Sequence, residues 1–282
     1  MISRPKVALI AGAAHGGTTI ANMILGQHPE IFATGKLRDF PNGDVFSEDK
    51  VCAPGDRSCW ECSCGELAMY CPFWQEVRER YARLADQPIE ERLPELFRMI
   101  IELSGRQFVG DVTHNVGYAR QLMEIKGIDL YLIHVVRDGR GVVNSRLRKD
   151  YNMMLLKKAG WRHTRRVVKL SRRWLRQHHA LAALEQQLGP KAVRISHEDL
   201  CINPRTTLQP VGACLGLDFD SIGAALGAGE PFRPVPHLIR GNANLRLGKE
   251  VVLKYEPTLL TRMSGLDQAI FRLASKLPVL GH

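Results

Sequence analysis

The sequence predicts a three-layer α/β fold, in which a central parallel sheet lies between two layers of helices. Apolar runs that are bounded by glycine or by charged residues recur along the 282-residue chain, and helical patterns separate them. The first of these runs passes through a glycine-rich loop directly into a helix. Because strands that alternate with helices form a parallel sheet, we expect functional residues at the carboxyl ends of the strands. We predict a single domain over residues 1–282.

Each predicted element has its own local signal. Residues 6–11, "KVALIA", form a continuous apolar run typical of a fully buried parallel strand, and a helix follows over "TTIANMILGQHP", which ends near Gly26 and Pro29. Later strands are expected within three stretches, 106–114, 128–141 and 191–200. Helical patterns cover residues 75–103, 158–188 and 203–217.

Composition and charge restrict the class of protein. The chain is 45% hydrophobic and 24% charged, as in ordinary soluble proteins, and "VALIAGAA" is about half the length of a membrane span. We expect no membrane span and no signal peptide, hence a cytoplasmic protein. Residues 146–178 hold 12 Lys and Arg and one acid, a local charge of +11, so the rest of the chain sums to about −1 of the net charge of +10. This basic helical segment (147–188) predicts a local anionic partner or a solvated helix face; nucleic acid is disfavoured because aromatic residues do not alternate with the charges.

A small Cys-rich insertion is predicted over residues 41–75. Five of the seven cysteines lie between Cys52 and Cys71, and "CWECSCG" contains a C-x-x-C without a second pair at zinc-finger spacing. A structural zinc, local disulfides and free thiols all remain open. We assign no metal ligand and no catalytic cysteine, because no helix start or basic neighbour marks a thiolate.

The loop "GAAHGGTT" (12–19) resembles a phosphate loop that lacks its lysine. Gly12, Gly17 and Thr19 fit the pattern G-x-x-x-x-G-K-[ST], but Thr18 stands at the lysine position. Converging backbone N–H groups and the helix amino end would hold one phosphate, whereas a triphosphate needs the lysine. The loop therefore predicts a P-loop-like fold whose ligand is not a nucleoside triphosphate.

A second anion site is expected in "HVVRDGRGVVNSRLRK". Arg137 follows a strand directly, and Ser145 lies eight residues later on the next helix. A guanidinium and a hydroxyl in this arrangement suit a dianionic phosphate.

These motifs together resemble sulfotransferases that use 3′-phosphoadenosine 5′-phosphosulfate (PAPS), especially the bacterial-type branch. The glycine loop and its helix are similar to the family's 5′-phosphosulfate loop, and "RDGRGVVNS" is similar to its 3′-phosphate motif R-D-P-R-x-x-x-x-S. Looser matches follow in family order: "CSCGELAMYCPFW", "DVTHNV", "ISHEDLCINPRTTL" and "HLIRGNANLR". The resemblance extends over residues 7–246.

The resemblance implies roles for named residues. The 5′-phosphosulfate would be held by His15, Gly16, Gly17, Thr18 and Thr19, and the 3′-phosphate by Arg137 and Ser145. The nucleotide would be closed over by Arg240, Gly241, Asn242 and Arg246. The expected reaction moves a sulfuryl group to a hydroxyl or amine of a small-molecule, glycan or peptide acceptor, anionic acceptors included.

Three positions depart from the family pattern. His15 replaces the usual loop cation, Lys36 stands where many relatives have a glutamate base, and His114 replaces the lysine of D-S-S-K. We therefore expect Lys36 to supply charge near the sulfate and His15 or His114 to take the proton of the acceptor. The alternatives are a phosphate-loop kinase or hydrolase, for which Thr18 is the wrong residue, and a nucleotide-binding relative without transferase activity.

Overall fold

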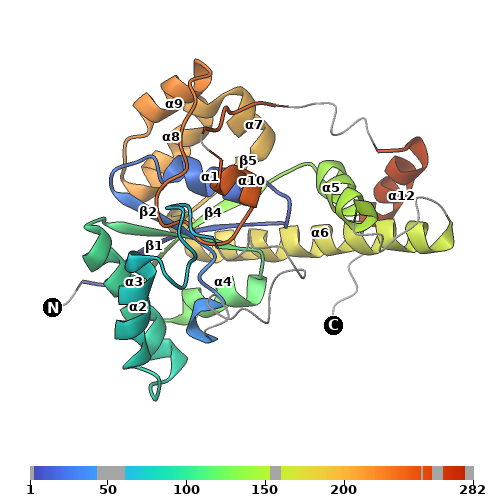
Figure 1. Ribbon diagram of the computed structural model, residues 1–282. Helices are drawn as coiled ribbons and strands as arrows, with labels where there is room; N and C mark the ends of the chain where they lie inside the picture. Colours follow the sequence, from blue (N-terminus) through green and yellow to red (C-terminus); the bar gives the residue numbers. More distant parts are fainter. Residues whose placement is uncertain (1–2, 43–60, 153–159, 249, 256–262, 277–282) are drawn as a thin grey trace.

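One parallel five-stranded sheet forms the centre of the molecule in the computed structural model (Figure 1). The structure describes residues 3–42, 61–152, 160–248, 250–255 and 263–276. The strands lie in the order β2-β3-β1-β4-β5, with β1 at Lys6–Gly12, β2 at Ile31–Gly35, β3 at Phe108–Thr113, β4 at Asp129–Val136 and β5 at Ala192–Ser196. This arrangement confirms the predicted α/β fold.

Alternating residues of β1 face two hydrophobic cores. Val7 and Leu9 belong to one core and Ala8 and Ile10 to the other, as the two-residue period of a strand requires. The first core is covered by α2 (Pro72–Ala82), α3 (Ile89–Ser104), α4 (Val116–Glu124) and α6 (Trp161–Leu188). The second is covered by α1 (Thr18–Leu25), α7 (His197–Ile202), α8 (Pro204–Leu215) and α9 (Asp220–Gly227). Figure 1 shows the two helical layers on opposite faces of the sheet.

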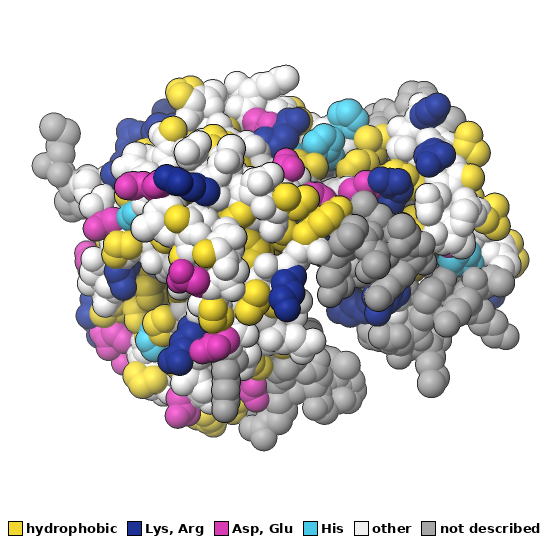
Figure 2. Space-filling model, turned by 90° about the horizontal axis from the view of Figure 1, so that it is seen from above, with side chains coloured by type: hydrophobic (Ala, Val, Ile, Leu, Met, Phe, Trp, Pro, Cys, Tyr) yellow, Lys and Arg dark blue, Asp and Glu magenta, His cyan; other side chains and the backbone are white. Residues whose placement is uncertain are grey.

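The amino-terminal half of α6 projects beyond the sheet and carries a small lobe of its own. α5 (Gly139–Asn152) and α12 (Gly265–Lys276) pack against it through a third apolar cluster that includes Val143, Val167 and Phe271 (Figure 1). In Figure 2 basic and acidic side chains are mixed over the main body, whereas the charged side chains visible on the lobe at the right are mostly Lys and Arg. Within the described residues, no helix combines the length and the apolar character that crossing a membrane would need.

Some elements differ from the sequence prediction. The helical stretch 75–103 is two helices, because the chain breaks at "ADQP" and α3 begins after Pro88. Strand β2 was not predicted. Cys52, Cys59, much of the insertion 41–75 and residues 153–159 of the basic segment lie outside the described residues.

Candidate functional site

The glycine loop turns sharply between β1 and α1, as its sequence predicts. Gly17 is the residue before α1 and has φ 90°, a left-handed conformation that disfavours a side chain. A Cβ at Gly17 would also lie 2.3 Å from Nδ1 of His197, so the position requires glycine on two grounds. The first N–H groups of α1 have no partner inside the helix and are available to an anion.

A cavity of about 1060 Å³ lies beside this loop and brings together most of the predicted site. Ten of the thirteen predicted residues line it: His15, Gly17, Thr18, Thr19, Lys36, His114, Arg137, Ser145, Gly241 and Asn242. They come from the carboxyl ends of β1, β2, β3 and β4, from the first turn of α1, from α5 and from a loop more than 200 residues away from the glycine loop. The carboxyl edge of the sheet therefore gathers them, as expected for a parallel α/β fold.

Three predicted residues do not line this cavity. The N–H of Gly16 donates to the carbonyl of Ala13 at 2.8 Å and so closes the loop on itself. The guanidinium of Arg240 donates to Asp39 at 3.2 Å. Arg246, 1% exposed, donates to the backbone carbonyl of Glu61. Each of them is adjacent in sequence to a residue that lines the cavity.

Arg137 and Ser145 converge on His15. Nη1 of Arg137 donates to the carbonyl of His15 at 2.8 Å, and Oγ of Ser145 lies 3.2 Å from its Nδ1. The adjacent carboxylate of Asp138 forms its salt bridge with Arg140, at 2.5 Å. The guanidinium of Arg137 is thus held against the glycine loop. The two predicted anion sites therefore lie next to each other.

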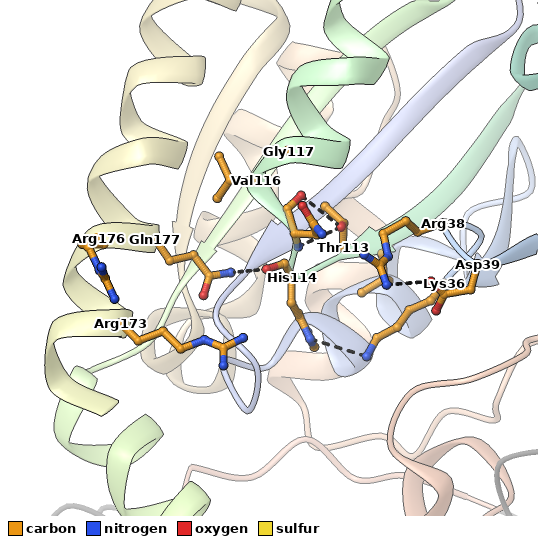
Figure 3. A pocket seen from close by; sticks show the side chains of 12 residues that line it. Lys36, Arg38, Asp39, Thr113, His114, Val116, Gly117, Arg173, Arg176 and Gln177 are labelled. Carbon is orange, nitrogen blue, oxygen red and sulfur yellow. Dashed lines mark hydrogen bonds and ion pairs between the residues drawn. The ribbon is translucent and has the colours of Figure 1, made fainter. Parts of the chain in front are cut away.

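A chain of polar contacts links the loop to Lys36. Oγ1 of Thr18 lies 2.9 Å from Nε2 of His114, and Nδ1 of the same ring lies 3.4 Å from Nζ of Lys36. Figure 3 shows Lys36 and His114 pointing toward each other, with Arg173 of α6 directed at them from the opposite side.

Lys36 and His114 also line a second, neighbouring cavity of about 540 Å³. Arg38, Arg173 and Arg176 bring further positive charge to it, and Asp39 is its one acid among the described residues. Asp39 is already paired with Arg38 at 2.7 Å. Lys36 and His114 therefore stand at the junction of two cavities, both rich in cationic groups.

The electrostatics of the site keep its histidines neutral. Burial, reinforced by Lys36, His15 and Arg173, lowers the pKa of His114 to about 3. Burial and the nearby Arg146, Lys149, Arg137 and Lys36 lower the pKa of His15 to about 4. Burial also lowers the pKa of Lys36. The site disfavours additional positive charge and suits an anionic ligand.

The structure adds four residues that sequence reasoning missed. Lys149, Arg146 and Lys254 line the larger cavity and increase its positive charge, and His197 lines it with a buried Nδ1 that has no partner among the described residues. Ser145 and Lys149 are four residues apart on α5, a spacing that places them on one helix face. That spacing was readable in the sequence, whereas the positions of Lys254 and His197 depend on tertiary structure.

The loop that follows Phe232 lies against the glycine loop and β2. The N–H of Ile239 donates to the carbonyl of Thr34 at 2.8 Å, and the N–H of Asn242 donates to Oγ1 of Thr19 at 3.4 Å. This carboxyl-terminal loop (residues 233–242) therefore forms one wall of the larger cavity.

Comparison with known proteins agrees with this architecture. The model of the sulfotransferase family matches residues 8–221. No curated protein matches the chain. The sulfotransferase domain from the Synechococcus PCC 7002 olefin synthase is similar over 98% of this chain and 97% of that domain, with 17% identity and a TM-score of 0.62.

A second solved structure has the same likeness of fold. The sulfotransferase domain from the curacin biosynthetic pathway is similar over 98% of this chain and 100% of that domain, with 16% identity and a TM-score of 0.57. Because the family model matches well over half of the sequence, and these folds agree with it, the chain belongs to the sulfotransferase family.

Proposed function

We propose that this sulfotransferase takes its sulfuryl group from PAPS and transfers it in line to a hydroxyl or amine of an acceptor. One observation carries the proposal: a glycine loop without a lysine and the Arg137–Ser145 pair open into the same cavity. The loop suits a phosphosulfate and the pair suits a separate phosphate, and PAPS carries both on one nucleoside.

The cavity offers a division of binding roles. N–H groups and hydroxyls of Gly17, Thr18 and Thr19 would hold the 5′-phosphosulfate, and Arg137 and Ser145 the 3′-phosphate. Gly241 and Asn242 would close the nucleotide side from the carboxyl-terminal loop. His15 would support both anion sites, since its carbonyl and ring contact Arg137 and Ser145. Gly16, Arg240 and Arg246 would act behind the wall, holding the backbone in place.

The transfer step belongs at the junction of the two cavities. An acceptor oxygen that reaches the junction from the smaller cavity attacks sulfur, the sulfur–oxygen bond to the phosphate breaks, and its electron pair leaves with 3′-phosphoadenosine 5′-phosphate (PAP). We assign the acceptor's proton to His114 rather than to His15, because His114 lines both cavities. Lys36 would offset negative charge on the sulfate and on the departing phosphate oxygen.

The lowered pKa of His114 is compatible with this role, because binding of the donor changes the charge around the ring. Its pKa is lowered by burial and by cationic neighbours, chiefly Lys36. An anionic donor bound beside the ring favours the protonated imidazole and raises the pKa back toward the ordinary value. Binding of the donor would therefore activate the base.

The smaller cavity favours an anionic acceptor. Arg38, Arg173 and Arg176 line it, and the carboxylate of Asp39 is shared by Arg38 and Arg240. A small molecule, a glycan or a peptide that carries a carboxylate, phosphate or sulfate near its reactive hydroxyl would match this lining.

Thermal melting with nucleotides tests the donor. We expect PAP to raise Tm, and AMP, which lacks the 3′-phosphate, to raise it much less. A shift produced instead by ATP or GTP with Mg²⁺ would contradict PAPS as donor and favour the kinase or hydrolase alternative. Incubation with [³⁵S]PAPS and a panel of acceptors then tests transfer; stabilisation by PAP without transfer to any acceptor would identify a binding protein.

A further inference from the structure

A cluster of sulfur and nitrogen atoms lies apart from the residues that line the two cavities. The Sγ atoms of Cys62, Cys64 and Cys71 and a ring nitrogen of His237 all lie within 4.8 Å of one another. Sγ of Cys71 is 3.7 Å from Sγ of Cys64 and 3.2 Å from Nδ1 of His237. Three of these side chains come from the Cys-rich insertion, and the fourth comes from the carboxyl-terminal loop, 166 residues from Cys71.

We propose that Cys62, Cys64, Cys71 and His237 bind a structural Zn²⁺ ion. Three cysteines and one histidine form a standard ligand set for structural zinc, which prefers four ligands in a tetrahedron. With Zn–S bonds of about 2.3 Å, two sulfurs at tetrahedral corners lie roughly 3.8 Å apart. The 3.7 Å between Cys64 and Cys71 agrees with this spacing and is far too long for a sulfur–sulfur bond of about 2.05 Å.

The backbone between Cys62 and Glu66 forms a hydrogen-bonded turn. The N–H of Cys62 donates to the carbonyl of Glu66 at 2.7 Å, and the N–H of Gly65 donates to the carbonyl of Cys62 at 3.0 Å. Cys71 immediately precedes α2, whose Pro72 fixes the first helical residue. Cys62 and Cys71 are fully buried, while Cys64 is exposed, so an ion has a route of entry.

The imidazole of His237 is oriented by its neighbours. The ring stacks on Phe73, with 5.1 Å between centroids and 17° between planes, and the carbonyl of His237 accepts from Nε1 of Trp74 at 2.8 Å. His237 has φ 63°, a left-handed conformation uncommon for a non-glycine residue. The backbone of His237 is held in this conformation, and its Nδ1 is directed at Sγ of Cys71. The ring is therefore already placed to bind a metal ion.

The ion would link the Cys-rich insertion to the carboxyl-terminal loop, which forms one wall of the larger cavity. Ser63, between two of the ligands, donates to the carbonyl of Val235 at 2.6 Å and accepts from the N–H of Leu238 at 2.8 Å. The same loop continues to Gly241 and Asn242, which line the larger cavity. All four coordination positions would be filled by protein, so the ion has a structural role and takes no part in the chemistry.

Metal analysis of the full chain tests this site directly. Protein expressed with zinc and purified without chelator should contain about one zinc per chain by inductively coupled plasma mass spectrometry. Removing the ion with a strong chelator under reducing conditions should lower Tm by roughly 10 °C, and added Zn²⁺ should restore it. Co²⁺ in its place should give the absorption spectrum of a tetrahedral, thiolate-bound ion.

Single substitutions assign the ligands. Cys64→Ser and His237→Ala should each lose most of the zinc, whereas the control Cys214→Ser, a free cysteine on α8, should retain it. Wild-type protein that lacks metal and whose Tm does not respond to zinc would overturn the proposal, as would an intact mass showing a disulfide among the three cysteines. The metal content of wild type decides the matter even if a variant fails to fold. None of these measurements depends on PAPS, so they fail or succeed independently of the proposed function.

Discussion

Nζ of Lys36 lies 3.4 Å from Nδ1 of His114, at the junction of the two cavities. An ammonium group can only donate, so the ring accepts at Nδ1 and carries its hydrogen on Nε2. That hydrogen points at Oγ1 of Thr18, 2.9 Å away. Lys36 therefore fixes the tautomer of His114 and connects it to the glycine loop. In this state both ring nitrogens are occupied, so His114 can take the acceptor's proton only at Nδ1, after the ammonium group of Lys36 has turned from the ring to the sulfate oxygens.

Replacing Lys36 by methionine should lower kcat by about 10²–10³, the usual effect of losing one group that stabilises developing negative charge. Methionine keeps the length of the side chain and removes its charge, so the shift in Tm on adding PAP should fall only slightly. Transfer of [³⁵S]sulfate at saturating donor measures kcat. Lys126→Met, an exposed lysine outside both cavities, serves as the control. If Lys36→Met kept kcat within threefold of wild type, Lys36 would have no part in the transition state.

His114→Asn should change how stability depends on pH. The pKa of His114 is lowered to about 3 in the folded protein and is near 6.5 when unfolded, so the unfolded chain binds one more proton between these values. Stability from the neutral ring is complete above pH 6.5 and is lost as the pH falls toward 3. In wild type, this residue contributes a slope of about 1.4 kcal/mol per pH unit in that window.

Urea unfolding of wild type and His114→Asn at pH 4.5, 5.5 and 7 measures the difference. The two free energies of unfolding should approach one another as the pH falls. Taking the difference removes the contribution of Asp111, whose pKa burial raises to about 7 and whose effect on stability has the opposite sign. A difference that is constant with pH would mean that the ring of His114 is solvated and not buried among cations.

The local parts of this fold could be predicted from the sequence, and the long-range contacts could not. The strand, glycine loop and helix over residues 6–25 follow from an apolar run, two closely spaced glycines and a helical pattern, all within 20 residues. Strand β2 was not predicted because it has only five residues, the last two of which are Thr34 and Gly35. So short a segment shows no clear hydrophobic period. Its signal was the apolar "IFA" between a proline and a glycine.

The residues of the candidate site also divide into those whose positions follow from local sequence and those whose positions depend on long-range contacts. Arg137 and Ser145 are close in sequence, and both line the larger cavity. Arg246 was expected at the nucleotide because of its position in a motif, but its guanidinium donates to the carbonyl of Glu61, 185 residues away in the sequence. The cysteine cluster acquires its fourth member, His237, by a comparable long-range contact. Only tertiary structure brings such partners together.

Arg137→Ala should remove the preference of the protein for a 3′-phosphate. Charged hydrogen bonds of this kind contribute about 1.5–3 kcal/mol, so PAP should bind roughly 10–100-fold more weakly, while AMP should lose much less. Isothermal titration of both ligands gives the ratio of the two Kd values. Arg140→Ala is the matched control, because that guanidinium pairs with Asp138 and does not line the cavity. Equal losses for PAP and AMP would mean that Arg137 only supports the loop through the carbonyl of His15.

Arg173→Gln/Arg176→Gln should raise the KM for an anionic acceptor by at least tenfold and leave the binding of PAP unchanged. Both arginines line the smaller cavity and neither lines the larger one, so the charge they supply acts on the acceptor side. Arg165→Gln/Lys169→Gln removes the same charge from α6 at exposed positions outside both cavities and should leave KM unchanged. KM should also rise with ionic strength in wild type, because salt screens the attraction between these two arginines and the anionic acceptor. The rise should be much smaller in Arg173→Gln/Arg176→Gln, which lacks this attraction. If both double variants raised KM equally, the acceptor would respond to the overall positive potential of α6. The smaller cavity would then not be the acceptor site.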